Sequence, residues 1–131
     1  MNKPINDFRD LIIWQKAISF AKAVYILTKR FPPDEKFGMT SQIRRAAVSV
    51  SSNIAEGYAR QRKEFSYFLS IARGSLAETE SLLFLAVELG YLLLNDTTSA
   101  RNLAQEIRRM ASKLSRVIDS QRGQAVLTPG P

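Results

Sequence analysis

The 131-residue sequence contains no cysteine and no histidine. Without cysteine, the chain can form neither a disulfide nor a thiolate metal site. Without histidine, it lacks the commonest metal ligand and the usual general base at neutral pH. A metal site would have to be built from carboxylates alone. We therefore expect no cofactor, no metal and no catalytic activity.

Long apolar runs are also missing. The longest uncharged run near the middle of the chain, residues 46–55, is far shorter than the roughly 20 residues that cross a bilayer. The first ten residues contain acidic side chains and no apolar stretch, so they do not resemble a secretory signal. Together with the absence of cysteine, these features predict a cytoplasmic protein without a membrane partner.

Several sequence motifs of enzymes are absent as well. The chain has no phosphate-binding GxxxxGK[ST] loop and no GxGxxG motif after a strand. No serine can be matched with a histidine and an aspartate. The two adjacent serines, Ser51 and Ser52, fall within a helical pattern and have no base beside them.

What the sequence does contain is helical periodicity. Apolar residues recur at helical spacing in four segments, at about 10–30, 39–60, 64–89 and 97–122. Pro32 and Pro33 end the first segment, Gly90 is expected to stop the third, and residues 95–98 offer N-caps for the fourth. With short connections and no strand pattern, the sequence predicts an all-α, antiparallel up-down-up-down four-helix bundle. Residues 1–122 would form this single domain, and residues 123–131 a flexible tail.

The third segment is apolar on two sides. One stripe holds Phe65, Phe68, Leu69, Ala72, Leu76, Thr79 and Leu83, and a second holds Tyr67, Ile71, Ser75, Leu82, Leu85 and Leu89. Two stripes on one helix predict two packing partners. In a bundle of only four helices, the second partner is expected to be another copy of the chain.

The second segment separates into two faces at 100° per residue. Ile43, Ala47, Val50, Ile54 and Tyr58 share one face, and Arg45, Ser49, Ser52, Glu56 and Arg60 share the opposite one. The second face is a narrow stripe of short polar groups and charges of both signs. Near its end, Gly57 either allows close helix contact or relaxes the chain before the next turn.

This stretch carries a family resemblance. The motifs SNIAEG at 52–57, QIRRA at 42–46, EFSYFLSIARGSLAETESLL at 64–83 and FRDLIIWQKA at 8–17 resemble the four-helix-bundle proteins encoded within intervening sequences of bacterial 23S ribosomal RNA genes. The likeness covers roughly residues 8–122. It implies a four-helix bundle that assembles into a homopentamer with a central opening, and it brings no settled biochemical activity. The segment GYARQRKEF at 57–65 departs from the family, which usually has Ser or Thr before the lysine.

The polar residues around this motif have two readings each. Glu78 lies beside the second apolar stripe, where a carboxylate is costly unless paired, so we expect a buried ion pair with Arg44 or Arg45 within one subunit or across an interface. The other reading is an acid that handles protons or binds a ligand. Asn53 and Glu56, four residues before Arg60, either bond neighbouring helices or subunits or line a shared surface such as a pore. Together the family-motif polar cluster comprises Arg45, Ser52, Asn53, Glu56, Gly57 and Glu78.

The net charge of +7 is unevenly distributed, because residues 64–96 are acidic and their flanks are basic. Arginine suits phosphate because its guanidinium binds two oxygens at once. The basic candidates are Arg60, Arg62 and Lys63 between the second and third segments, and Arg101, Arg108, Arg109, Lys113 and Arg116 on the fourth. A solvated face is the alternative reading. We interpret the chain as a non-catalytic oligomeric scaffold that binds RNA or DNA, and the alternative is a protein–protein adaptor without nucleic acid.

Overall fold

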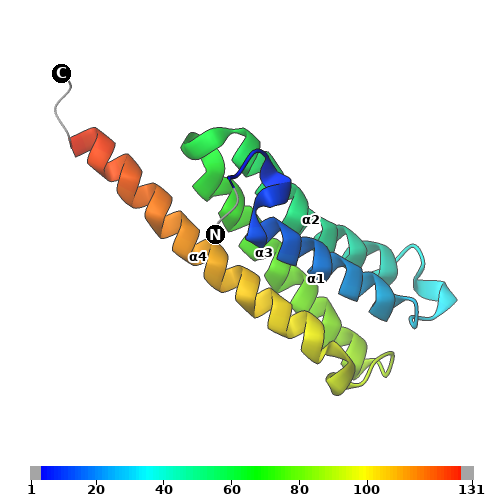
Figure 1. Ribbon diagram of the computed structural model, residues 1–131. Coiled ribbons are helices and arrows are strands. Elements are labelled where there is room, and N and C mark those ends of the chain that lie inside the picture. The colour runs from blue at the N-terminus through cyan, green and yellow to red at the C-terminus, as the bar shows by residue number, and fades with distance from the viewer. Residues whose placement is uncertain (1–3, 128–131) are drawn as a thin grey trace.

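The computed structural model describes residues 4–127, except for the side chains of residues 62–63 and 122–127, and within this range it is helical with no strand. Four long helices, α1 Ile12–Thr28, α2 Met39–Ala59, α3 Gln61–Glu88 and α4 Thr98–Leu127, form the body of the protein (Figure 1). Three short 3-10 helices, η1 Phe8–Asp10, η2 Pro33–Glu35 and η3 Leu94–Thr97, lie in the connections. Helices adjacent in sequence pack together, and α1 closes the bundle against α4. The predicted antiparallel four-helix bundle is confirmed.

The core is built from the inward face of every helix. The largest side chains that are fully buried include Phe20, Ile43, Ile54, Leu69, Leu76, Leu83 and Ile107. Burying each one contributes about 1.5–3 kcal/mol relative to leaving it in water. The first apolar stripe of α3 therefore packs as predicted.

Helix α3 ends at a glycine, as the sequence indicates. Gly90 has φ +80°, a left-handed conformation that favours glycine. Its N–H donates to the carbonyl of Val87 at 3.0 Å, and the next N–H, of Tyr91, donates to Ala86 at 2.9 Å. This paired pattern is the Schellman motif, which satisfies carbonyls that the helix end would leave free.

The connection between α2 and α3 is shorter than the sequence suggested. Helix α3 begins at Gln61 rather than near residue 64, so only Arg60 and Gln61 turn the chain. Gln61 takes the left-handed conformation at φ 61°. The two helices approach closely here, because a Cβ on Gly57 would lie 2.7 Å from Cβ of Phe68. Of the two readings of Gly57, close helix contact is the one the structure shows.

Helix α4 is longer than predicted. The apolar period fades after residue 122, but the helix continues to Leu127 and extends past the α2–α3 connection (Figure 1). The helix thus ends five residues later than the predicted residue 122, and residues 128–131 lie outside the described part. A flexible tail stays a prediction. A single glycine at position 123 lowers helix stability without ending the helix. The strong stop signal is Pro129, which disfavours helical geometry in the residue before it.

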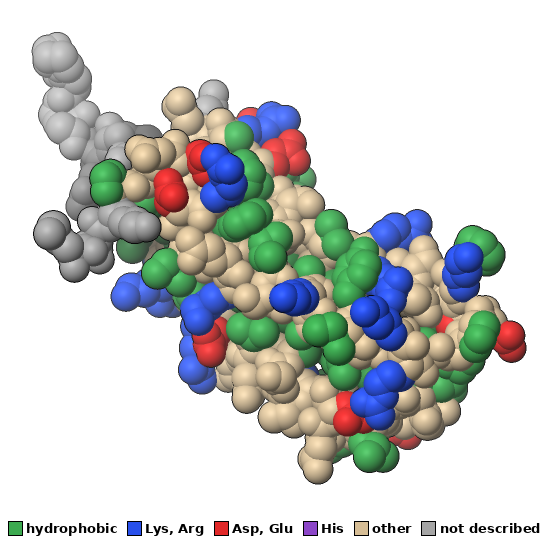
Figure 2. Space-filling model, turned by 45° about the vertical axis from the view of Figure 1, so that its right-hand side comes forward, with side chains coloured by type: hydrophobic (Ala, Val, Ile, Leu, Met, Phe, Trp, Pro, Cys, Tyr) green, Lys and Arg blue, Asp and Glu red, His purple; other side chains and the backbone are tan. Residues whose placement is uncertain are grey.

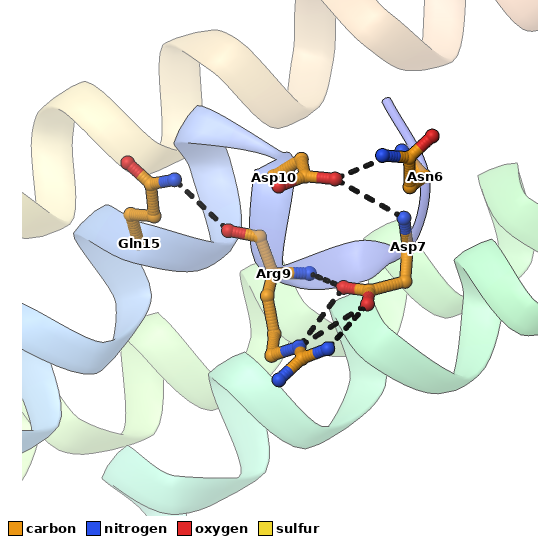
Figure 3. Close-up of polar contacts among 5 residues, drawn as sticks. All are labelled: Asn6, Asp7, Arg9, Asp10 and Gln15. Atoms are coloured by element: carbon orange, nitrogen blue, oxygen red, sulfur yellow. Dashed lines mark hydrogen bonds and ion pairs between the residues drawn. The ribbon is translucent and has the colours of Figure 1, made fainter. Parts of the chain in front are cut away.

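The chain enters α1 through a network of polar contacts around η1 (Figure 3). The Asp7 carboxylate accepts from the backbone N–H of Arg9 at 2.7 Å and pairs with its guanidinium at 2.7 Å. These hydrogen bonds from Arg9 hold the pKa of Asp7 below its usual value of 3.8. Asp10 accepts from the backbone N–H of Asn6, and Gln15 donates to the carbonyl of Arg9. These contacts fix the start of the bundle.

Candidate nucleic-acid interface

The outer face of α4 carries three exposed cations. Arg109, Lys113 and Arg116 are spaced i, i+4 and i+7, so they lie on one side of the helix, away from the buried Ile107 and Ala111. Among the described residues, none of the three has an ion-pair partner. We call these three residues the α4 basic strip.

The other two predicted cations of α4 turn toward α3. Arg108 forms an ion pair with Glu80 of α3. Arg101 donates from Nε to Oγ1 of Thr97 at 3.0 Å, and its guanidinium lies over the ring of Phe84, 5.4 Å from the centroid. Both side chains therefore serve contacts within the bundle. Of the predicted group of five, three have no ion-pair partner among the described residues and two are engaged.

In the second predicted basic group, two carboxylates largely neutralise the charge of Arg60. Its guanidinium contacts Glu64 at 3.1 Å and Glu56 at 3.3 Å. The hydrogen bond that Arg60 donates to Glu64 is the main reason that the pKa of Arg60 is raised. Arg62 and Lys63 belong to the first turn of α3 rather than to a loop, and their side chains lie outside the described residues. Arg60 therefore adds little to a surface for phosphate.

The family-motif cluster does not form a single site within the chain. Asn53 donates to the carbonyl and the hydroxyl of Ser49, at 2.8 and 2.9 Å, and Ser75 of α3 donates to the same hydroxyl at 2.9 Å. Gly57 is buried between α2 and α3. By contrast, Arg45, Ser52 and Glu56 are exposed on the outer side of α2. The cluster thus combines a helix–helix contact with a polar outer stripe.

Glu78 is not buried, and the predicted ion pair with Arg44 or Arg45 is absent within the chain. Its carboxylate is exposed and accepts a long hydrogen bond, 3.5 Å, from Nε2 of Gln42. The expected burial within one chain is wrong, because Tyr67 and Leu85 on the same face of α3 are themselves exposed. An ion pair of Glu78 across an interface between copies stays a prediction. Arg44 points the other way, toward α1, where its Nε donates to Oγ1 of Thr28 at 2.8 Å.

Sequence reasoning missed a hollow between α1 and α2. Its volume is about 730 Å³, and its lining includes Tyr25, Lys36, Phe37, Arg44, Arg45 and Val48. Figure 2 shows basic and hydrophobic side chains interspersed on one face of the molecule. Phe37 is 89% exposed. It escaped the sequence analysis because it falls between helical segments, where periodicity carries no information.

Within the described residues, no group of three or more acidic side chains is placed to hold a metal ion. No helix in the same part of the chain is both long and apolar enough to traverse a bilayer.

Comparison with known proteins bears on the family and the fold. The sequence profile of the 23S rRNA-intervening sequence protein family matches residues 9–113. A crystal structure from Bacteroides thetaiotaomicron, described as a protein with unknown function from the S23 ribosomal protein family, is similar with 28% identity and a TM-score of 0.72. The similarity covers 79% of this chain and 98% of that one. Among curated proteins, none matches the sequence. The chain therefore belongs to the 23S rRNA-intervening sequence protein family.

Proposed function

We propose that this protein is a non-catalytic, oligomeric helical scaffold that binds the phosphate backbone of nucleic acid through the α4 basic strip. The observation that carries the proposal is the set of three exposed cations, Arg109, Lys113 and Arg116, on one face of α4. The family's description as 23S rRNA-intervening sequence proteins makes RNA the first nucleic acid to test.

The mechanism is electrostatic. Lysine and arginine displace condensed counterions from phosphates, so the logarithm of affinity falls linearly with the logarithm of salt concentration. Three phosphate contacts per copy correspond to a slope of about −2 to −3. No aromatic residue alternates with these cations along α4 between Arg109 and Arg116. Contacts to the backbone rather than stacking on bases are therefore expected, with little sequence preference.

Self-association is the second part of the proposal. On α3 and at its C-cap, Tyr67 is 64% exposed and Leu89 is 50% exposed, and both belong to the second apolar stripe of the sequence. A monomer leaves these side chains in water, whereas a neighbouring copy would cover them. In an oligomer the α4 basic strip is repeated, so weak contacts add through multivalency.

The test compares two double variants of equal charge. Arg109→Gln with Lys113→Gln removes two cations from the α4 basic strip. Lys22→Gln with Lys29→Gln removes two exposed cations from α1. We expect the first pair to weaken binding of a fluorescein-labelled single-stranded RNA about tenfold in fluorescence anisotropy, and the second pair to have little effect. Absence of binding at low salt, a nearly flat salt dependence, or equal losses for both pairs would contradict the proposal.

A protein–protein adaptor is the competing function. Copurification from the native host separates the two, because the bound RNA, DNA and protein are all identified. Partners that remain after nuclease treatment, with no enriched nucleic acid, would favour the adaptor.

A further inference from the structure

The hollow between α1 and α2, which we call the α1–α2 hollow, carries positive charge without a counter-charge. Its described lining contains three cations, Lys36, Arg44 and Arg45, and no acidic side chain. Within the described part of the chain, none of the three has an ion-pair partner. A concave surface lined by charges of one sign concentrates their field and attracts ions of the opposite sign. The hollow is therefore suited to an anionic ligand.

Arg44 is held in the wall of the hollow by contacts with α1. Its Nε donates to Oγ1 of Thr28 at 2.8 Å, and its guanidinium lies over the ring of Tyr25, 4.5 Å from the centroid. Thr28 is itself buried and donates to the carbonyl of Tyr25 at 3.1 Å. None of these partners is negatively charged, so the charge of Arg44 stays uncompensated. A cation that is already positioned loses little entropy when a ligand binds.

Hydroxyl groups lie beside these cations along the same face of α2. The lining includes the side chains of Thr40, Ser41, Ser49 and Ser52. Hydroxyls donate hydrogen bonds to anionic oxygens, and an arginine can bind two phosphate oxygens at once. A terminal phosphate has three acceptor oxygens and nearly two negative charges at neutral pH. It can therefore use several of these donors together, whereas a carboxylate offers only two oxygens and one charge.

An exposed aromatic ring stands at one end of the hollow. Phe37 lines it from a turn that protrudes from the bundle (Figure 1). Glu35 orders this turn, because it accepts from the backbone N–H of Met39 at 3.1 Å and from the hydroxyl of Tyr91 at 2.8 Å. Exposed aromatic side chains next to positive charge are the surfaces on which nucleic acid bases stack. The turn thus supplies a platform for a planar ring.

The size of the hollow fits one nucleotide. Its volume of about 730 Å³ lies within the range of roughly 300–1,000 Å³ that is usual for small-molecule sites. Met39 begins α2 two residues after Phe37, and Arg44 follows five residues later. At 1.5 Å per residue, Arg44 lies about 7–8 Å along the helix from Met39. A sugar between a base and a phosphate spans a gap of this order.

We propose that the α1–α2 hollow binds a nucleotide through its terminal phosphate, with Arg44 and Arg45 at the phosphate and Phe37 stacked on the base. The nucleotide is either free or the phosphorylated end of a strand, since both present the same groups. The described lining residues belong to α1, α2 and the turn between them. The site is therefore separate from the α4 basic strip, and the inference goes beyond the proposed function without resting on it.

Calorimetric titration with three probes tests the two contacts separately. Adenosine 5′-monophosphate carries both groups, ribose 5-phosphate lacks the base, and adenosine lacks the phosphate. We expect the monophosphate to bind at least tenfold more tightly than either of the other two at low salt. Ribose 5-phosphate that binds equally well would overturn the stacking, and adenosine that binds equally well would overturn the phosphate contact. No binding of the monophosphate at millimolar concentration would overturn the whole proposal.

Variants of exposed residues test the location. Phe37→Ala should weaken binding of adenosine 5′-monophosphate about tenfold and leave ribose 5-phosphate unaffected. Arg45→Gln should weaken binding of both about tenfold, because it removes a phosphate contact. The matched control is Lys22→Gln, which removes an exposed cation of α1 outside the lining. Equal losses for Arg45→Gln and Lys22→Gln, or a Phe37→Ala variant that binds as wild type, would overturn the assigned site.

Two RNA trinucleotides of one sequence, with and without a 5′-phosphate, distinguish the sources of the ligand. We expect the phosphorylated one to bind at least tenfold more tightly, and equal affinities would overturn the proposal. If it also binds more tightly than adenosine 5′-monophosphate, the strand end is the ligand, and otherwise the free nucleotide is. Arg109→Gln with Lys113→Gln should leave the affinity for the monophosphate unchanged, so this site and the α4 basic strip can fail independently. A loss there as large as in Arg45→Gln would overturn the separate site.

Discussion

At the scale of single residues, Gly57 and Gly74 show that a glycine within a helix can either pack against a neighbouring helix or face open space. Both lie in helices, and the sequence analysis allowed close packing at Gly57. The structure places only Gly57 against a neighbouring helix. Sequence alone cannot separate the two, because helical periodicity gives the direction of a residue but not the distance to the next surface.

We expect Gly57→Ala to lower the free energy of unfolding by about 1–3 kcal/mol, because the added methyl group would force α2 and α3 apart at Phe68. Urea denaturation of the variant and wild type measures the change. The matched control is Gly74→Ala, where the methyl group meets open space in the single chain. That change should raise stability by about 0.5–1 kcal/mol under conditions where the protein is monomeric. Equal effects at both positions would contradict the packing described here.

Asp96 contributes to the pH dependence of the free energy of unfolding. The backbone N–H of Leu93, at 2.8 Å, and the Arg30 guanidinium, at 3.1 Å, lower the pKa of Asp96 from its usual 3.8. Because the pKa of Asp96 is lower in the folded protein than in the unfolded chain, ionised Asp96 stabilises the fold. This stabilisation is fully present above the pKa of the unfolded chain and is lost as the pH falls through the pKa of the folded protein.

Asp96→Asn keeps an acceptor for Leu93 but removes the charge that Arg30 contacts. We expect wild type to be more stable than the variant at pH 7, and this difference to shrink once the pH falls below about 3.8. Urea denaturation at pH 7 and pH 3, at fixed ionic strength, measures it. A difference that stays constant over this range would show that Asp96 does not act through its charge.

At the scale of elements, the buried faces of the helices were predicted better than the residues at which the helices begin and end. The buried stripe of α3 followed directly from its period, since Leu69, Leu76 and Leu83 are all fully buried. Its second stripe was predicted to be apolar, but sequence could not say which members the chain covers. Leu82 and Ser75 are buried, whereas Tyr67 and Leu85 are exposed. The misassigned burial of Glu78 has the same origin.

The α2–α3 connection is another element that sequence did not resolve. Gln61 adopts φ 61°, which costs a non-glycine residue about 1 kcal/mol or more. We therefore expect Gln61→Gly to raise the melting temperature, with a gain of up to about 1 kcal/mol. Gln61→Ala serves as the control and should bring no such gain, because alanine has the same difficulty with positive φ. A destabilised Gln61→Gly variant would indicate that the turn needs the glutamine side chain.

At the scale of the whole molecule, the fold was predictable and the site was only partly so. Four long periodic segments with short connections leave few arrangements other than a bundle. The site depends on which cations find partners in three dimensions. Within the described part of the chain, Arg108 and Arg60 form ion pairs and Arg109 forms none, yet all three look alike in the sequence. Phe37 lay outside any period and was missed for that reason.

The central claim is that copies of this chain associate because each leaves apolar side chains of α3 in water. Sedimentation equilibrium of the wild-type protein over micromolar concentrations tests this most directly. We expect a mass that is a multiple of the 14.7 kDa chain. A mass of one chain across the whole concentration range would contradict the account.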